Sequence, residues 1–150
     1  MAAPKPLPGQ VWKDDCYYFD PQTGECRRKY RLVLAVDPAS GDCVTMVFTS
    51  RPNGLTENPP CSLGPPRAGF FLGLLGGPLQ KPTWLDFSSV HTLDRSDLGN
   101  HVRTGRTTLT AIRIPQALFC AALRCAQQCE DITLRELRWI GDTAAELGCP

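Results

Sequence analysis

The segment DPQTGECRRKYR, residues 20–31, runs directly into the apolar run LVLAV of residues 32–36. Asp-Pro and Thr-Gly are turn-forming pairs, so the segment predicts a turn that leads into a buried strand. The turn brings Arg27, Arg28 and Lys29 close to the start of that strand, and Arg31 stands where the chain enters the core. Clustered cations at such a position favour a phosphate site, although a charge run often does no more than solvate a loop.

A second stretch, VTMVFTSR at residues 44–51, predicts the strand that neighbours residues 30–36 in a hairpin. The turn between them is DPASGD, residues 37–42. The second strand ends in the hydroxyls of Thr49 and Ser50, and Arg51 follows. Hydroxyl and guanidinium groups add hydrogen-bond donors to the predicted anion site.

Length and composition indicate one globular domain. The chain has 150 residues, 42% hydrophobic and 21% charged, with a formal net charge of +1. We expect a short disordered lead at residues 1–8, neither signal peptide nor membrane anchor, and a single domain over residues 9–150. A net charge this small leaves no overall field for nucleic acid, so any anion site must be local.

The eight cysteines allow more than one interpretation. A disulfide framework would suit a secreted chain, but without a recognisable secretion signal we expect reduced thiols and a cytoplasmic location. Cys125 and Cys129 would share a helical face, yet two ligands make a weak zinc site. The sequence therefore predicts no metal and no cofactor.

The order of patterns along the chain predicts a mainly β fold with C-terminal helices. Alternating and β-branched segments are followed by a helical pattern over about residues 115–147, with a capping box at Thr133 and Glu136. A Pro/Gly-rich insert at residues 52–82 reads as loops with one strand at residues 69–75. We expect a small, partly open barrel with two terminal helices. The strands are predicted at residues 10–12, 16–19, 30–36, 43–49, 83–87, 90–93 and 107–114.

These motifs together resemble the MazF/PemK-like toxins. The resemblance lies in Asp20-Pro21, Gly24 and Arg31, in the strand end at residues 47–50, and in VHTLD at residues 90–94 with Leu98. It implies an SH3-like barrel that cleaves single-stranded RNA without a metal, is silenced by an antitoxin protein and forms a homodimer. Arg31 and Thr49 would be the catalytic pair. The residues expected to bind RNA are Arg27, Arg28, Lys29, Ser50 and Arg51.

The sequence also departs from that family pattern. Leu32 stands where the family has proline, and Ser88-Ser89 replaces an acidic residue and glutamine. These departures favour an alternative, a catalytically silent barrel that binds protein or nucleic acid. In that alternative the insert is the docking surface, with the apolar residues of 70–75 as its anchors.

Histidine and aromatic side chains offer two further candidate groups. His91 and His101 would suit acid–base catalysis of RNA cleavage, although two histidines ten residues apart occur in many proteins without function. The aromatic side chains near the N-terminus would stack on unpaired bases, or pack in the core as most strand aromatics do. They are Trp12, Tyr17, Tyr18 and Phe19.

Overall fold

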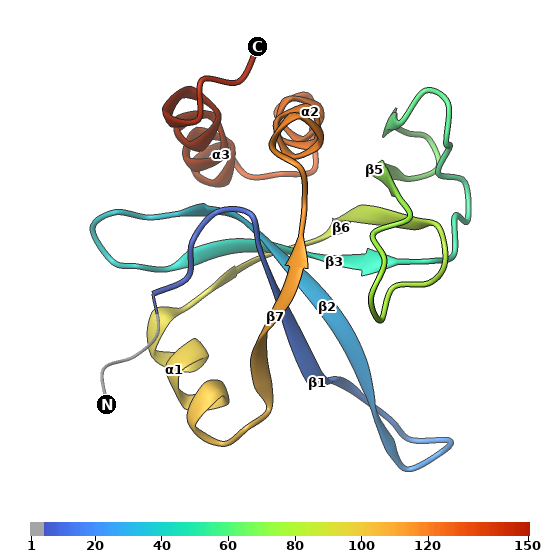
Figure 1. The fold of residues 1–150 in the computed structure, drawn as a ribbon, viewed down its shortest axis with the longest axis vertical. Coiled ribbons are helices and arrows are strands. Elements are labelled where there is room, and N and C mark those ends of the chain that lie inside the picture. The colour runs from blue at the N-terminus through green and yellow to red at the C-terminus, as the bar shows by residue number, and fades with distance from the viewer. Residues whose placement is uncertain (1–4) are drawn as a thin grey trace.

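The computed structural model describes residues 5–150 as a mainly β protein with three helices (Figure 1). The strands are β1 (Gln10–Asp20), β2 (Glu25–Val36), β3 (Cys43–Thr49), β4 (Cys61–Leu63), β5 (Ala68–Gly73), β6 (Thr83–Leu93) and β7 (Thr107–Arg113). The helices are α1 (Arg95–Arg103), α2 (Gln116–Ala126) and α3 (Leu134–Glu146). The prediction of a mainly β chain that ends in two helices is confirmed, whereas α1 was not foreseen.

The strands form one antiparallel sheet in the order β4-β5-β6-β3-β2-β1-β7. Each strand from β1 to β3 pairs with its sequence neighbour, as hairpins do. The segments expected at residues 83–87 and 90–93 are one continuous strand, β6. Within residues 5–150, β4 and β7 are the two edges of the sheet and do not pair with each other. The fold shown is therefore an open sheet.

The turn between β1 and β2 is formed by the residues that the sequence indicated. The Asp20 carboxylate accepts a hydrogen bond from the Gln22 amide at 2.9 Å, and Gly24 has a φ of +71°. Glycine adopts this left-handed conformation without the steric cost of a Cβ atom. Since β2 already begins at Glu25, the basic residues 27–29 lie in the strand and not in a loop before it.

Helices cover the two faces of the sheet unequally. Helices α2 and α3 pack on one face, as Figure 1 shows, and form the main core with Leu32, Leu34 and Phe87. Helix α1 lies on the other face, where Leu98 joins a smaller cluster with Trp12. Alternate residues of β2 therefore face two different environments.

The Pro/Gly-rich insert contributes part of the core. Phe70 and Leu72 of β5 are buried, and the ring of Phe71 lies 4.9 Å from that of Trp84. Gly69 leaves no space for a side chain, because a Cβ atom there would lie 2.5 Å from the Leu85 carbonyl oxygen. The expectation that Phe70 and Leu72 are docking anchors is therefore wrong, since β5 pairs with β6 and directs them inward.

Six cysteines are paired in three disulfides. Cys16 is joined to Cys26 within the β1–β2 hairpin, Cys61 of β4 to Cys125 of α2, and Cys120 of α2 to Cys149. The expectation of reduced thiols is wrong for these six, and the bond to Cys61 removes Cys125 as a zinc ligand. Two of the pairs join segments far apart in the sequence, so the spacing of the cysteines did not reveal them.

Cys43 and Cys129 are free and buried. Burial raises the pKa of the Cys43 thiol to about 12 and also raises that of Cys129, so neither is an ionised thiolate near neutral pH.

Helix α3 begins with the capping box that the sequence predicts. The Thr133 hydroxyl accepts a hydrogen bond from the Glu136 amide at 3.2 Å, and the Glu136 carboxylate accepts one from the Thr133 amide at 3.3 Å. That carboxylate also accepts a hydrogen bond from the Thr92 hydroxyl at 2.9 Å. The cap therefore ties the start of α3 to β6.

Residues 1–4 of the expected disordered lead lie outside the described residues. From Lys5 the chain leads into β1, and the Leu7 amide donates a hydrogen bond to the Gln10 side chain at 2.8 Å.

We expect protein denatured without reductant to react with an alkylating reagent at two thiols, and at eight after reduction, as counted by mass spectrometry. Peptide mapping should place the two labels on Cys43 and Cys129. Labelling of six further cysteines before reduction would contradict the disulfide pairing.

We expect Thr133→Ala to lower the free energy of unfolding by about 1 kcal/mol, because it removes the acceptor for the Glu136 amide. Urea unfolding followed by circular dichroism measures the loss. Thr133→Ser keeps a hydroxyl and should stay close to wild type. An alanine variant as stable as the serine variant would show that the cap contributes nothing.

Candidate anion-binding pocket

A pocket of about 320 Å³ lies where β2, the end of β3 and the segment before β6 meet. Its lining includes basic residues from all three places: Arg28 of β2, Arg51 after β3 and Lys81 before β6. The hydroxyl residues Thr49 and Ser50 line it too. Its lining residues, all within the described residues 5–150, include no aspartate or glutamate. The pocket therefore collects cations and hydrogen-bond donors with no opposing carboxylate in its wall.

Short local hydrogen bonds shape both rims of the pocket. The Thr49 hydroxyl accepts a hydrogen bond from the Arg51 amide at 3.1 Å, which turns the chain at the end of β3. On the opposite rim, the Gln80 side chain donates to the Gly77 carbonyl and the Thr83 hydroxyl donates to the Lys81 carbonyl at 3.0 Å. Both cation-bearing segments are thus held by contacts of their own.

The basic residues of the pocket are only partly neutralised. Arg28 lies 3.2 Å from the Asp15 carboxylate, but both side chains are exposed, and such a pair contributes about 0–1 kcal/mol in water. Within residues 5–150, Arg51 and Lys81 form no salt bridge. The pocket is a local positive site on a chain whose net charge is only +1.

Arg31 lies outside this pocket, in a buried cluster around Asp14. Its guanidinium donates to the Asp14 carboxylate at 3.3 Å and to the Thr45 hydroxyl at 3.2 Å, and stacks over the Tyr17 ring. Arg106 donates to the same carboxylate at 3.0 Å. In β2, Arg31 is on the face opposite to Arg28, because side chains alternate along a strand. The pocket that Thr49 lines does not include Arg31, so the predicted catalytic pair is not brought together.

Of the five residues that the sequence predicts to bind RNA, four line the pocket and one does not. Arg28, Lys29, Ser50 and Arg51 line the pocket with Thr49. Arg27 does not, because it forms an ion pair with Asp20 at 2.9 Å, beyond the pocket along the hairpin. The hydrogen bond from Arg27 and the bond from the Gln22 amide hold the pKa of Asp20 below its usual value.

Lys81 was missed by sequence reasoning. It stands as a single lysine between Gln80 and Pro82 in the insert, and only the pairing of β6 with β3 brings it beside Arg51.

The two histidines are also apart. His91 is exposed on β6, while His101 of α1 lies 3.3 Å from Arg106, so they form no acid–base pair.

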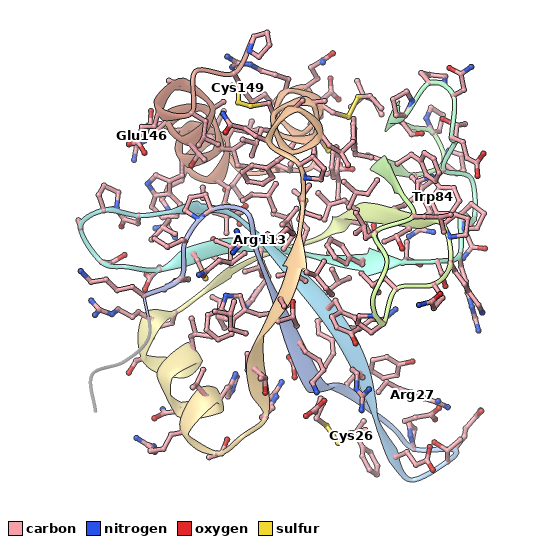
Figure 2. The ribbon with its side chains drawn as sticks, viewed as in Figure 1. Cys26, Arg27, Trp84, Arg113, Glu146 and Cys149 are labelled. Atoms are coloured by element: carbon pink, nitrogen blue, oxygen red, sulfur yellow. A yellow bond between two sulfur atoms is a disulfide. The ribbon has the colours of Figure 1, made fainter. Side chains whose placement is uncertain are left out.

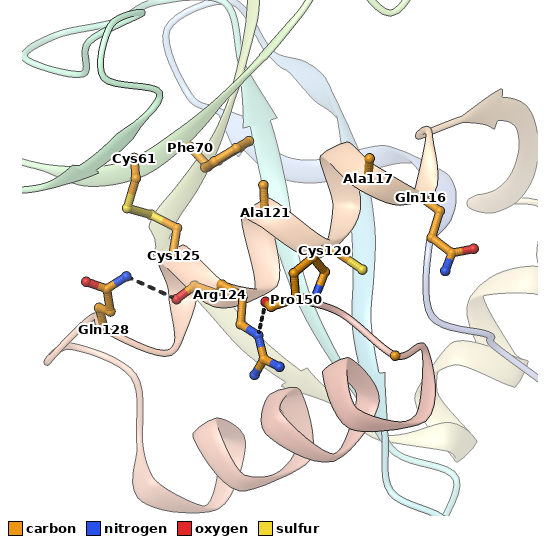
Figure 3. A pocket seen from close by; sticks show the side chains of 11 residues that line it. Cys61, Phe70, Gln116, Ala117, Cys120, Ala121, Arg124, Cys125, Gln128 and Pro150 are labelled. Atoms are coloured by element: carbon orange, nitrogen blue, oxygen red, sulfur yellow. Dashed lines mark hydrogen bonds between the residues drawn. A yellow bond between two sulfur atoms is a disulfide. The ribbon is translucent and has the colours of Figure 1, made fainter.

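A larger groove of about 640 Å³ lies beside α2 and holds none of the predicted site residues. Figure 3 shows its walls, which include Phe70, Ala117, Ala121 and the disulfide between Cys61 and Cys125. Arg124 is the basic residue among its lining residues, and its guanidinium already donates to the carbonyls of Cys149 and Pro150. The groove is apolar and offers no uncommitted charge for a ligand.

Comparisons of the chain with protein-family models, curated proteins and solved structures find no match. The resemblance to the MazF/PemK-like toxins therefore depends on the sequence motifs alone and remains a prediction. None of the helices in the described part of the chain has the length and apolar character needed to cross a membrane.

Asp14 keeps its charge in the folded protein. Burial opposes ionisation, but hydrogen bonds from Arg106 and the Cys16 amide and the charges of Arg106 and Arg31 outweigh it and lower the pKa from 3.8. A carboxyl group whose folded pKa is lowered adds stability above its unfolded pKa. This stability is lost as the pH falls through the folded value.

We expect Asp14→Asn to lower the free energy of unfolding at neutral pH by about 3 kcal/mol, since Arg31 and Arg106 lose their shared partner. Unfolding measured from pH 7 to pH 2 should show a shallower acid decline than wild type. Asp142→Asn, an exposed change on α3, is the control. Equal stability of the two variants would refute the role of the cluster.

Proposed function

We propose that the protein binds the phosphate backbone of single-stranded RNA in the pocket formed by Arg28, Arg51 and Lys81. The observation that carries the proposal is the convergence of four basic residues, these three and Lys29, on a pocket whose lining holds no carboxylate. Arginine binds phosphate through paired hydrogen bonds and lysine through its point charge. The Ser50 hydroxyl adds a donor, and the Thr49 hydroxyl adds one when it leaves the Arg51 carbonyl, to which it donates at 3.3 Å. Because the net charge is only +1, the chain has no strong overall positive field, and the attraction for phosphate must be local.

RNA is the phosphate ligand that the family resemblance implies. In that resemblance the strand end at residues 47–50 belongs to the RNA site, and the basic pocket forms around this strand end. The SH3-like barrel, the antitoxin partner and the homodimer belong to the same resemblance and remain proposals with it.

Metal-independent cleavage of the bound strand is the second candidate function. The observation that favours it is the Thr49 hydroxyl, which lies in the pocket next to the Arg51 backbone. Attack by a ribose 2′-hydroxyl on the adjacent 3′-phosphate forms a 2′,3′-cyclic phosphate and breaks the bond to the 5′-oxygen of the next nucleotide. Water takes the proton of the 2′-hydroxyl and supplies one to the leaving 5′-oxygen, while nearby guanidinium and hydroxyl groups stabilise the negative charge that builds on the phosphate. In this scheme Arg28 and Arg51 take the charge-stabilising role first assigned to Arg31, which is engaged with Asp14.

The cysteines favour one kind of compartment for this protein. Glutathione and thioredoxin keep cytoplasmic thiols reduced, and three disulfides favour an oxidising compartment. We therefore do not propose the cytoplasmic location that was expected from the sequence.

We expect Arg51→Ala and Lys81→Ala each to weaken binding of a fluorescent oligouridylate by about 10-fold, as loss of a charged hydrogen bond does. Fluorescence anisotropy across a salt series measures both affinity and salt dependence. Each variant should reduce the slope of log K against log salt by about 0.7. Arg138→Ala, which removes an exposed cation on α3, is the control, and equal losses in all three variants would contradict a pocket-specific site.

We expect purified protein to cleave a long mixed-sequence RNA in the presence of a chelator, and Thr49→Ala to slow this cleavage by about 10²-fold. Thr49→Ser keeps the hydroxyl and should retain most of the activity. Gel analysis of end-labelled RNA gives the rates. RNA binding without cleavage by the wild-type protein would leave the silent binding module as the function.

A further inference from the structure

The β1–β2 hairpin carries an aromatic side chain that the fold leaves in solvent. Phe19 is 60% exposed and belongs to neither of the two hydrophobic clusters. Figure 2 shows its strand partner Cys26 at the far end of the hairpin, away from α2 and α3. Single exposed hydrophobic side chains are common on protein surfaces, so the position of Phe19 relative to the basic pocket carries the argument.

Strand register places Phe19 beside the basic pocket. Phe19 pairs with Cys26, and Arg28 of the pocket is two residues further along β2. Residues two apart in a strand point to the same face and are separated by about 7 Å along it. Phe19 and Arg28 therefore lie on one face of the hairpin, while Tyr18 and its partner Arg27 lie on the other.

The backbone that carries Phe19 is cross-linked to the neighbouring strand. The disulfide between Cys16 and Cys26 cross-links the two strands at the register partner of Phe19. The Asp15–Arg28 ion pair connects β1 to β2 between this disulfide and the pocket. A hairpin that is cross-linked before the ligand arrives loses less backbone freedom on binding.

We propose that Phe19 stacks on an unpaired base of the RNA strand whose phosphate occupies the basic pocket. The inference rests on the proposed function and adds a base contact to its phosphate contacts, one that only a single strand offers because a base within a duplex has no free face for stacking. Stacking on an aromatic ring tolerates any base, so Phe19 supplies affinity and strand selectivity without sequence selectivity.

The test compares three labelled probes by fluorescence anisotropy: an octamer of uridylate, an octamer of the same backbone without bases, and an eight-base-pair RNA duplex. We expect wild-type protein to prefer the uridylate octamer to both others. Phe19→Ala should weaken uridylate binding by about 10-fold and leave binding of the baseless octamer unchanged, since stacking is lost and phosphate contacts remain. Phe19→Trp should restore the affinity.

Two controls separate this proposal from the proposed function. Tyr18→Ala removes the exposed ring on the opposite face of the hairpin and should leave uridylate binding unchanged. Arg51→Ala should weaken binding of the uridylate and the baseless octamers alike. Wild-type protein that binds neither octamer overturns the proposed function and this inference together.

Other outcomes would overturn the inference alone. These are a Phe19→Ala variant that binds uridylate as wild type does, or one that loses the same affinity for the baseless octamer. Binding to anionic lipid vesicles that depends on Phe19, with uridylate binding unaffected by Phe19→Ala, would assign the ring to a membrane surface instead.

Discussion

Asp14 is a carboxylate that the fold has removed from water, and the local structure depends on how its charge is satisfied. Its side chain is 1% exposed, and it accepts hydrogen bonds from Arg31, Arg106 and the Cys16 amide. An isolated buried charge costs several kcal/mol, so the carboxylate is stable there only with these partners. They come from β1, from β2 and from the residue before β7. One charge therefore joins three segments, on the side of the sheet away from α2 and α3.

The same constraint decides which arginine is available to a ligand. Side chains alternate along β2, so Arg31 turns toward Asp14 while Arg28 turns to the opposite face. The basic pocket forms on that face, and no carboxylate is among its lining residues. The loops at the end of β3 and before β6 complete it with Arg51 and Lys81. A structural charge cluster and a candidate ligand site thus occupy the two faces of one strand.

Local sequence patterns predicted those parts of the secondary structure that depend on residues close together in the chain. The turn at residues 21–24, the alternation of β7 and the capping box of α3 each depend on neighbours within a few residues. Helix α1 was missed because Leu98 is its one buried residue, which gives too weak a helical pattern.

What the sequence left open depends on contacts between distant residues. Cys61 pairs with Cys125 across 64 positions, and no spacing rule identifies such a partner. The role of Arg31 changed because Asp14, 17 positions earlier, takes its guanidinium. The candidate site was therefore only partly predictable: its strand-end residues follow from local patterns, whereas the contribution of Lys81 and the withdrawal of Arg31 follow from the tertiary fold.

The most direct test of the basic pocket as the RNA site is an NMR titration of ¹⁵N-labelled protein with a uridylate octamer. We expect the largest amide and side-chain shifts at Arg28, Ser50, Arg51 and Lys81, with Asp14 and the guanidinium of Arg31 unmoved. Shifts centred on Asp14, Arg31 and Arg106, with the pocket residues unchanged, would contradict it.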